Sequence, residues 1–462
     1  MRTAVAPTGP ARWIALVVLA GGCGQIPTAP PPLAATSISI TPLQAIVTTG
    51  ETVQARVVAR AQGTVVGAAV EWTSSNGAVA TVTSNGLVTA VGNGTSTITA
   101  GTGTLTATLE VRVEPPGLGR IVDSVRRAFG LPAMGGAIIT KAGTEALAVA
   151  GTRRASGGLP VTAADNWHIG SNLKAITSAL AAIAVDAGVL SWSTTVTEAF
   201  PELGIAIVAQ YRDVTIADLL SHRAGIRNDP PLTAFLGSTA VSQRASLVTW
   251  ALESPPVGPV GSFFYSNIGY LVAATMIERA WGGVYEDLLT THLLQPLGVT
   301  GLGWGPQAEA GADDQPVAHS LRNGSWVPCE GCDNPPGLSA AGRAHLPLGD
   351  WARIIREFLL IDAGRSSLIS PVNGKELFTG RVDLSGDSYA LGWVMTTRDW
   401  AGGRAAAHDG TNTVNHSVAW LGLGADLGLI AVTNAGDLDT GTTGRALDAL
   451  VGRMIRFHLD HR

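Results

Sequence analysis

The chain has 462 residues, of which 46% are hydrophobic and only 14% are charged. A chain of this length and composition can bury large cores, and it should divide into two or more domains. Its net charge of −5 shows no basic excess, and no cluster of arginine and lysine with interleaved aromatic residues appears. We therefore expect no nucleic-acid partner, which leaves small molecules and the cell envelope.

The first 23 residues have the pattern of an export signal. Two arginines accompany an apolar run at residues 13–20, and Gly-Gly-Cys23 follows it. The run is too short to span a bilayer as a helix. The small residues before Cys23 resemble the lipobox of bacterial lipoproteins, although Leu19 stands one position further from the cysteine than usual. We expect an exported cell-envelope protein that is anchored to the membrane by a lipid on Cys23, with an uncleaved anchor or plain secretion as alternatives.

A proline-rich tether at residues 24–35 should be extended. The pattern then changes, because residues 36–114 contain short alternating runs rich in threonine and valine, separated by Gly and Asn turns. This pattern predicts an all-β sandwich, with Trp72 in its core. Residues 71–76 and 85–99 resemble the group 2 bacterial Ig-like domain, which acts as a spacer or an adhesive module.

An interdomain linker is expected at residues 115–119, where a Pro-Pro-Gly stretch begins. Beyond it, helix and strand patterns mix through residues 120–462, which predicts one large α+β domain.

A serine and a lysine with the spacing S-x-x-K, Ser171 and Lys174, stand at the start of a run of good helix formers that ends at Gly188. They should lie in the first turn of a helix and share one face of it. A serine hydroxyl becomes a nucleophile when a base takes its proton, and a lysine can be that base if burial lowers its pKa. Lysine is rare in this chain, where most cations are arginines that cannot release a proton. Taken alone, the pair fits equally well a surface lysine beside a helix-start serine.

Two later motifs in this domain are Tyr265-Ser-Asn267 and His408-Asp-Gly410. With the S-x-x-K pair, they resemble in order and spacing the marks of the class C β-lactamase and serine-type D-alanyl peptidase family, which are S-x-x-K, Y-x-N and K/H-x-G. The resemblance implies a multidomain chain in which the Ig-like sandwich precedes an α+β β-lactamase/transpeptidase-like domain. That domain would have an antiparallel sheet flanked by helices and a helical subdomain.

The resemblance also implies a serine hydrolase that works through an acyl-serine intermediate on esters or amides. Ser171 would attack while Lys174, with Tyr265 as a phenolate or relay, accepts its proton. Tyr265 would then activate water, which requires a pKa well below ~10. Asn267 would hold Lys174 and the substrate. The backbone N–H groups of Ser171 and Thr411 would form the oxyanion hole.

His408 stands where many members of this family carry lysine. Because histidine is mostly neutral at pH 7, it suits a substrate carboxylate poorly, and the resemblance shifts toward the esterase and D-aminopeptidase-like branches. His408 and Gly410 would contact the substrate, with Gly410 leaving room along the strand, while Asp409 should point to the opposite face. His222 is expected to pack in a loop.

The two remaining cysteines and the other histidines carry further expectations. In an exported protein Cys329 and Cys332 would close a small disulfide, with free thiols as the alternative. The histidines form no H-x-H-x-D or H-E-x-x-H cluster, so no metal or cofactor is implied. Four other histidines are expected on the surface or in loops: His292, His319, His345 and His416.

The substrate class is left open by the residues. It would be a small acyl compound or a peptidoglycan-like peptide, in a pocket shaped by residues 228–242 and 305–337. The rival interpretation is a catalytically idle penicillin-binding-fold envelope protein, in which the Ig-like module acts as a binding or spacer domain.

Overall fold

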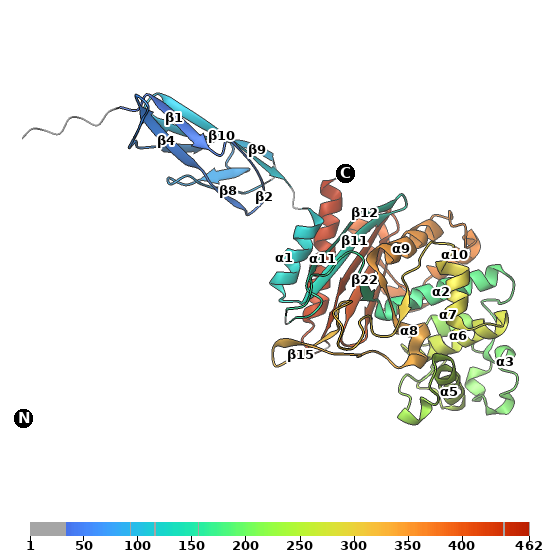
Figure 1. Ribbon diagram of the computed structural model, residues 1–462. Helices are drawn as coiled ribbons and strands as arrows, with labels where there is room; N and C mark the ends of the chain where they lie inside the picture. Colours follow the sequence, from blue (N-terminus) through green and yellow to red (C-terminus); the bar gives the residue numbers. More distant parts are fainter. Residues whose placement is uncertain (1–33, 93, 115–116, 156, 438, 462) are drawn as a thin grey trace, which may run out of the picture. The chain divides into compact units, whose positions relative to one another are not determined.

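The computed structural model (Figure 1) describes residues 34–92, 94–114, 117–155, 157–437 and 439–461. The expected signal segment and Cys23 lie outside the described residues. The chain divides into two compact units between residues 115 and 116, which is inside the expected linker. In the part of the chain that the structure describes, no helix has the length and apolarity needed to cross a membrane.

The first unit is the predicted Ig-like β-sandwich. Its strands are β1 (Ser37–Thr41), β2 (Gln44–Thr48), β3 (Thr52–Gln54), β4 (Arg56–Ala61), β5 (Thr64–Val66), β6 (Glu71–Ser74), β7 (Ala80–Val82), β8 (Leu87–Ala90), β9 (Gly94–Thr102) and β10 (Leu105–Glu114). They form sheets in the orders β1-β4-β5, β2-β10-β9-β6 and β3-β8-β7. In β10, Leu109 and Val111 are buried while Glu110 between them is exposed, as in a strand with one face on a core. Trp72 packs against this core.

The second unit is built on an eight-stranded sheet with the order β12-β11-β23-β22-β21-β20-β19-β18. The strands are β11 (Ala133–Thr140), β12 (Gly143–Gly151), β18 (Val382–Leu384), β19 (Asp387–Tyr389), β20 (Val394–Arg398), β21 (Gly403–Thr411), β22 (His416–Gly422) and β23 (Leu427–Thr433). All neighbouring pairs are antiparallel. The hairpin β11–β12 adds to β23, so the two ends of this unit's chain meet in one sheet.

Helices cover both faces of this sheet. The helices α1 (Leu118–Ala128) and α11 (Thr442–Asp460) pack on one face, and α9 (Leu348–Asp362) packs on the other (Figure 1). Strand β11 shows the cause, because Met134 and Ile138 join the core under α1 and α11, whereas Ala137 and Ile139 join the core under α9. Successive side chains of a strand point to opposite faces, so an apolar strand can bind helices on both.

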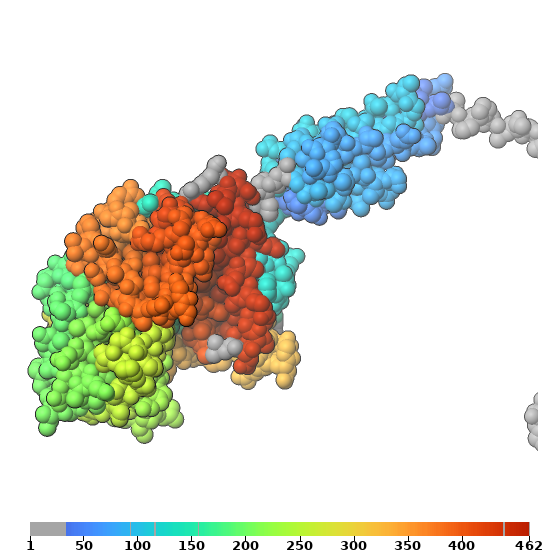
Figure 2. All heavy atoms as spheres, turned by 180° about the vertical axis from the view of Figure 1, so that it is seen from behind, coloured from blue at the N-terminus to red at the C-terminus, as the bar shows by residue number. Residues whose placement is uncertain are grey.

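A helical subdomain extends the core on the α9 side. Its helices are α2 (Leu173–Asp186), α3 (Val196–Ala199), α4 (Ile216–Leu220), α5 (Ala240–Glu253), α6 (Asn267–Trp281), α7 (Tyr285–Leu289), α8 (Ser339–Gly342) and α10 (Pro371–Leu377). Helix α2 is buried around most of its circumference, where it contacts α6, α8 and α10. From the reverse side, Figure 2 shows the subdomain (green) at one end of this unit and α11 (red) at the other.

Two small sheets complete the unit. One joins β13 (Asn166–His168), β17 (Ala344–Pro347) and β14 (Gly303–Trp304), and the other joins β16 (Ser325–Pro328), β15 (His319–Arg322) and β24 (Ala435–Gly436). Strand β13 matters most for the site, because Ser171 follows it by three residues.

The expectation that His319 and His345 lie on the surface or in loops is wrong. Both are buried on strands of the small sheets. His319 shows the reason, because its Nε2 accepts from the backbone N–H of Ala155 at 3.0 Å and its Nδ1 lies 2.9 Å from Asn434 O. A neutral imidazole accepts with one nitrogen and donates with the other, so it can satisfy two buried backbone groups.

Candidate active site

Ser171 and Lys174 lie at the junction of β13 and α2. Ser171 belongs to the 3₁₀ turn Gly170–Asn172, which runs directly into α2, and Lys174 is the second residue of that helix. Lys174 Nζ lies 2.9 Å from Ser171 Oγ. The spacing predicted this contact, although the serine precedes the α-helix.

The side chain of Lys174 is completely buried. Its Nζ donates to Asn267 Oδ1 and to Ala341 O, each at 2.7 Å. Burial lowers the pKa of Lys174 well below its usual value. A neutral amine has two hydrogens and one lone pair; with both hydrogens donated to these acceptors, the lone pair is available to the Ser171 hydroxyl. Lys174 can therefore act as the base for Ser171.

Tyr265 approaches the same serine from the other side, with its hydroxyl 2.9 Å from Ser171 Oγ. Burial raises the pKa of Tyr265 to about 12, although 39% of the residue's surface stays exposed. The expected lowering of the Tyr265 pKa, which a phenolate in the resting site would require, is therefore absent. A neutral Lys174 supplies no cation beside the ring that could lower it. In the resting site the phenol is protonated and donates to Ser171 Oγ.

The start of α6 positions Tyr265 and Asn267. Ser266 caps this helix, with its Oγ accepting from the backbone N–H of Gly269 at 3.0 Å. Behind it, His222 Nδ1 accepts from the backbone N–H of Ser266 at 3.1 Å, and the His222 ring lies 4.2 Å from the Tyr265 ring. Burial lowers the pKa of His222 well below its usual value. His222 is thus a neutral packing residue, as the sequence suggested.

His408 of β21 is buried beside the cavity. Its Nδ1 lies 2.7 Å from Asp409 O, and its Nε2 lies 3.1 Å from the Tyr389 hydroxyl. Burial lowers the pKa of His408 to about 4. The imidazole is neutral, with Nδ1 donating and Nε2 accepting, so it offers no cation to a substrate carboxylate.

Gly410 has a different role from the expected one. A Cβ at Gly410 would lie 2.1 Å from Ile169 O and 2.6 Å from Asn172 Nδ2. The missing side chain therefore admits the Ser171 turn rather than the substrate. A Cβ at Gly170 would in turn lie 2.5 Å from the backbone nitrogen of Thr411, so the segments carrying the two expected oxyanion donors are in direct contact.

A cavity of about 480 Å³ opens at Ser171. It is lined by polar residues and by an apolar wall: Ser171, Tyr265, Asn267, Tyr389, His408, Asp409 and Thr411, with Phe263, Leu384 and Val394. Neither segment expected to shape the pocket, 228–242 or 305–337, contributes to this lining. The apolar wall carries no motif, which is why the sequence did not reveal it.

The sequence also missed the side chains that hold the Ser171 turn against the sheet. Asn172 Nδ2 donates to Ile169 O at 3.1 Å and to Ser417 Oγ at 3.0 Å. Ser417 Oγ donates to Ile169 O at 2.9 Å. An asparagine and a serine in these positions have no signature of their own, because their partners are brought near only by the fold.

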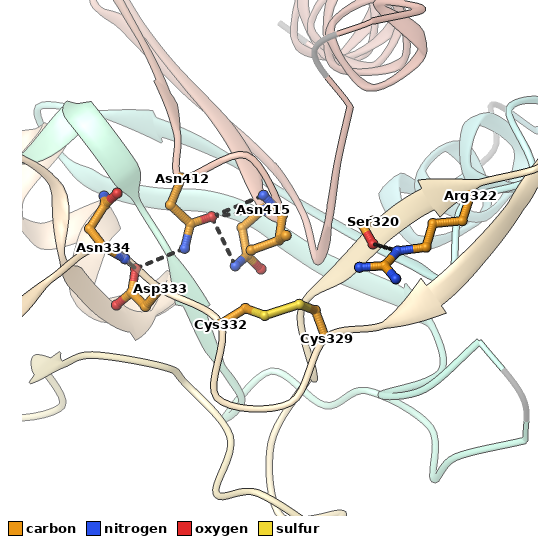
Figure 3. The surroundings of a disulfide bond; sticks show 9 residues. Ser320, Arg322, Cys329, Cys332, Asp333, Asn334, Asn412 and Asn415 are labelled. Atoms are coloured by element: carbon orange, nitrogen blue, oxygen red, sulfur yellow. Dashed lines mark hydrogen bonds between the residues drawn. A yellow bond between two sulfur atoms is a disulfide. The ribbon is translucent and has the colours of Figure 1, made fainter. Parts of the chain in front are cut away.

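Cys329 and Cys332 form a disulfide in the loop after β16 (Figure 3). Among the residues that the structure describes, no group of three or more His, Cys, Asp or Glu side chains could hold a metal ion.

Comparison with known families matches both units. The family described as Beta-lactamase matches residues 120–453, and the Bacterial Ig-like domain (group 2) matches residues 34–113.

Among curated proteins, the chain is 29% identical over 177 residues to penicillin-binding protein 4 of Amycolatopsis lactamdurans, covering 38% of this chain and 46% of that protein. It is 25% identical over 317 residues to the unguisins hydrolase ungD' of Aspergillus campestris (strain IBT 28561), covering 64% of this chain and 56% of that protein. The chain thus spans about half the length of these relatives.

Two solved structures share the fold. The octameric penicillin-binding protein homologue from Pyrococcus abyssi superposes with a TM-score of 0.60 at 22% identity, over 72% of this chain and 77% of that one. The D-amino acid amidase from Ochrobactrum anthropi SV3, complexed with L-phenylalanine amide, gives a TM-score of 0.59 at 19% identity, over 74% of this chain and 98% of that one.

Proposed function

The chain belongs to the beta-lactamase family of serine hydrolases through residues 120–453, and we propose that it is an exported enzyme that cleaves ester or amide bonds through an acyl-serine intermediate. One observation carries the proposal. The buried Lys174 has two acceptors for its hydrogens, and its nitrogen lies 2.9 Å from Ser171 Oγ. An idle fold would have no need to keep a lysine neutral beside a serine, since burying it costs free energy.

In the proposed acylation step, Ser171 Oγ attacks the substrate carbonyl carbon while its proton passes to Lys174 Nζ. The developing oxyanion is bound by the backbone N–H groups of Ser171 and Thr411. When the bond to the leaving group breaks, the Tyr265 hydroxyl protonates that group. The acyl-enzyme then contains a cationic Lys174 and a Tyr265 phenolate, and the cation stabilises the phenolate.

Deacylation restores both groups. The Tyr265 phenolate takes a proton from water, whose oxygen attacks the acyl carbon, and the departing Ser171 Oγ recovers its proton from Lys174. Tyr265 is thus a phenol in the resting enzyme and a phenolate only after acylation. This order of steps accounts both for the pKa of about 12 of Tyr265 in the free site and for the proposed role of Tyr265 as a base after acylation.

We propose that the preferred substrates are neutral esters or amides without a carboxylate beside the scissile bond. The cavity lining includes Asp409, whose carboxylate lies 2.9 Å from His416 Nε2, but it includes neither lysine nor arginine. His408 in the same lining is neutral. A penicillin-like carboxylate would therefore find no cation there. Amides belong to the proposal because a structural neighbour is a D-amino acid amidase and a curated relative is an unguisins hydrolase.

For the whole chain, we propose export and anchoring through a lipid on Cys23, with the Ig-like unit as a spacer. The support is the basic and apolar pattern before Cys23, and the disulfide, which is typical of oxidising compartments. Cys23→Ser should move the protein from the membrane fraction to the soluble fraction. Retention of this variant in the membrane would contradict lipid anchoring.

The hydrolase proposal is tested with a fluorophosphonate probe and a p-nitrophenyl ester. We expect the probe to label the peptide containing Ser171 and Ser171→Ala to lose both labelling and turnover. Ser193→Ala, at an exposed serine outside the cavity, is the control and should retain both. Turnover that persists in Ser171→Ala would refute the proposal.

A further inference from the structure

A buried carboxylate, that of Asp333, lies between the two segments that would form the oxyanion hole. Asp333 directly follows Cys332 of the disulfide, and its side chain is only 2% exposed. His168 Nε2 lies 2.9 Å from Asp333 Oδ1. Asn412 Nδ2 donates to the same oxygen at 2.9 Å, as Figure 3 shows. His168 ends β13 of a small sheet, and Asn412 directly follows β21 of the main sheet, so Asp333 links two parts of the fold.

On one side, His168 reaches the turn that carries Ser171. Its Nδ1 accepts from the backbone N–H of Gly170 at 3.1 Å. A neutral imidazole that accepts at Nδ1 carries its hydrogen on Nε2, which is the atom that faces Asp333. Asp333 thereby fixes both the tautomer and the orientation of His168, and His168 fixes the peptide next to Ser171.

On the other side, Asn412 directly follows Thr411. Its Oδ1 accepts from the backbone N–H of Asn415 at 2.9 Å, which closes the turn between β21 and β22 (Figure 3). With its amide nitrogen on Asp333 and its amide oxygen on Asn415, the Asn412 side chain has a single orientation. These contacts hold the residue that directly follows Thr411, and Thr411 Oγ1 itself donates to Asn415 O at 2.7 Å in the same turn.

Asp333 is negatively charged, and neighbouring contacts hold its segment of the chain in place. Burial raises the pKa of Asp333, but the close contact with His168 and two hydrogen bonds outweigh it and hold the pKa below its usual value. These hydrogen bonds come from Asn412 Nδ2 and from the backbone N–H of Asn334. The group is therefore a carboxylate that can accept several hydrogen bonds at once. Next to it, Asn334 Nδ2 donates to Gly342 O at 2.7 Å, and the disulfide closes the chain just before it.

We propose that Asp333 is a positioning residue that holds both halves of the oxyanion hole in register, through His168 on the Ser171 side and through Asn412 on the Thr411 side. This inference rests on the proposed function. Asp333 does not line the cavity and takes no part in proton transfer. Its effect is on the geometry of the donors, where a displacement of about 1 Å can cost about 100-fold in rate.

The test compares Asp333→Ala with Asp333→Asn. Alanine removes the acceptor for both contacts, whereas asparagine keeps an oxygen in the place of Oδ1. We expect kcat for a p-nitrophenyl ester to fall by about 100-fold in Asp333→Ala, with KM changed by less than about twofold, and to recover most of this loss in Asp333→Asn. Asp362→Ala is the matched control: it removes a largely buried carboxylate that pairs with Arg404 at the far end of β21, and it should leave kcat unchanged.

Amide hydrogen exchange supplies a readout independent of activity. In Asp333→Ala, exchange should accelerate in residues 167–173 and in residues 409–416. In the control Asp362→Ala, exchange should stay unchanged in both segments. If Asp333→Ala does not fold, His168→Asn replaces it, because asparagine keeps an acceptor for Gly170 but cannot reach Asp333. This variant should also lose kcat and speed exchange next to Ser171.

Different outcomes overturn different statements. A folded Asp333→Ala with the kcat of the wild type, or with exchange altered in one segment only, overturns the positioning role while the hydrolase proposal stands. A KM effect without a kcat effect does the same. A wild-type protein without turnover dependent on Ser171 overturns the proposed function and the inference with it.

Discussion

Lys174 Nζ lies over the ring of Tyr265, 4.9 Å from the ring centre, while both side chains lie 2.9 Å from Ser171 Oγ. An aromatic ring attracts a cation but not a neutral amine. The contact between the two residues should therefore strengthen after Lys174 has taken the Ser171 proton. The geometry would therefore stabilise the cationic Lys174 of the proposed acyl-enzyme.

Tyr265→Phe removes the hydroxyl that, in the proposed mechanism, protonates the leaving group and later activates water. We expect kcat to fall by about 100-fold to 10,000-fold. If acylation stays faster than deacylation in this variant, p-nitrophenol should be released in an initial burst. Tyr285→Phe is the matched control, since its buried hydroxyl lies 2.7 Å from Thr177 Oγ1 and outside the cavity. Stopped-flow absorbance measures both proteins, and a wild-type kcat in Tyr265→Phe would exclude the proposed role.

Lys174→Met should change how stability depends on pH. Burial lowers the pKa of Lys174 below 10.5, so over this range the unfolded chain binds a proton that the folded chain lacks. The wild type therefore gains stability as pH rises toward 10.5, and the methionine variant lacks this gain. Urea unfolding from about pH 7 to about pH 10 should show the variant's relative stability falling steadily. A constant difference would mean that Lys174 is charged in the folded protein.

The same residue gives a kinetic test. Lys174→Arg keeps a cation but cannot release its proton at working pH. We expect no labelling of Ser171 by the fluorophosphonate probe and no burst with the ester. Labelling at the wild-type rate would show that another group is the base.

Gly410→Ala should disturb the Ser171 turn, because the added Cβ meets the backbone oxygen of Ile169, which cannot move aside as a flexible side chain would. We expect a loss of about 1–3 kcal/mol in unfolding free energy and a fall in kcat. Gly452→Ala is the control, since a Cβ there meets no atom within 4 Å in helix α11. It should gain about 0.5–1 kcal/mol. A stable and fully active Gly410→Ala would contradict the close packing.

The side chains nearest to the reacting serine could be predicted, because their chemistry is tied to local patterns. The S-x-x-K spacing places Ser171 and Lys174 on consecutive turns of chain, and no tertiary information is needed for that. Tyr265 and Asn267 needed the resemblance to a family, since nothing local shows that α6 packs beside α2. The two-domain organisation followed from the abrupt change of pattern near residue 115.

What could not be predicted depends on contacts between distant segments. The protonation state of Tyr265 follows from burial, which residue spacing does not measure. Asp333 lacks a motif, because its partners lie far from it in the sequence. The sheet order was also hidden, since the pairing of β11 with β23 joins strands from opposite ends of the domain.

His408→Asn should reduce the loss of stability in acid. Burial lowers the pKa of His408 to about 4, against 6.5 for the unfolded chain, so between these values the unfolded chain takes a proton that the folded chain refuses. Stability is lost as pH falls through this window, by about 3 kcal/mol at 1.36 kcal/mol per pH unit. Asparagine removes that contribution, so the variant should lose about this much less between about pH 7 and about pH 4. Denaturant unfolding measures it against His461→Asn, at an exposed histidine, which should follow the wild type. If the unfolding free energies of His408→Asn and the wild type fall in parallel with pH, the fold does not hold the imidazole neutral.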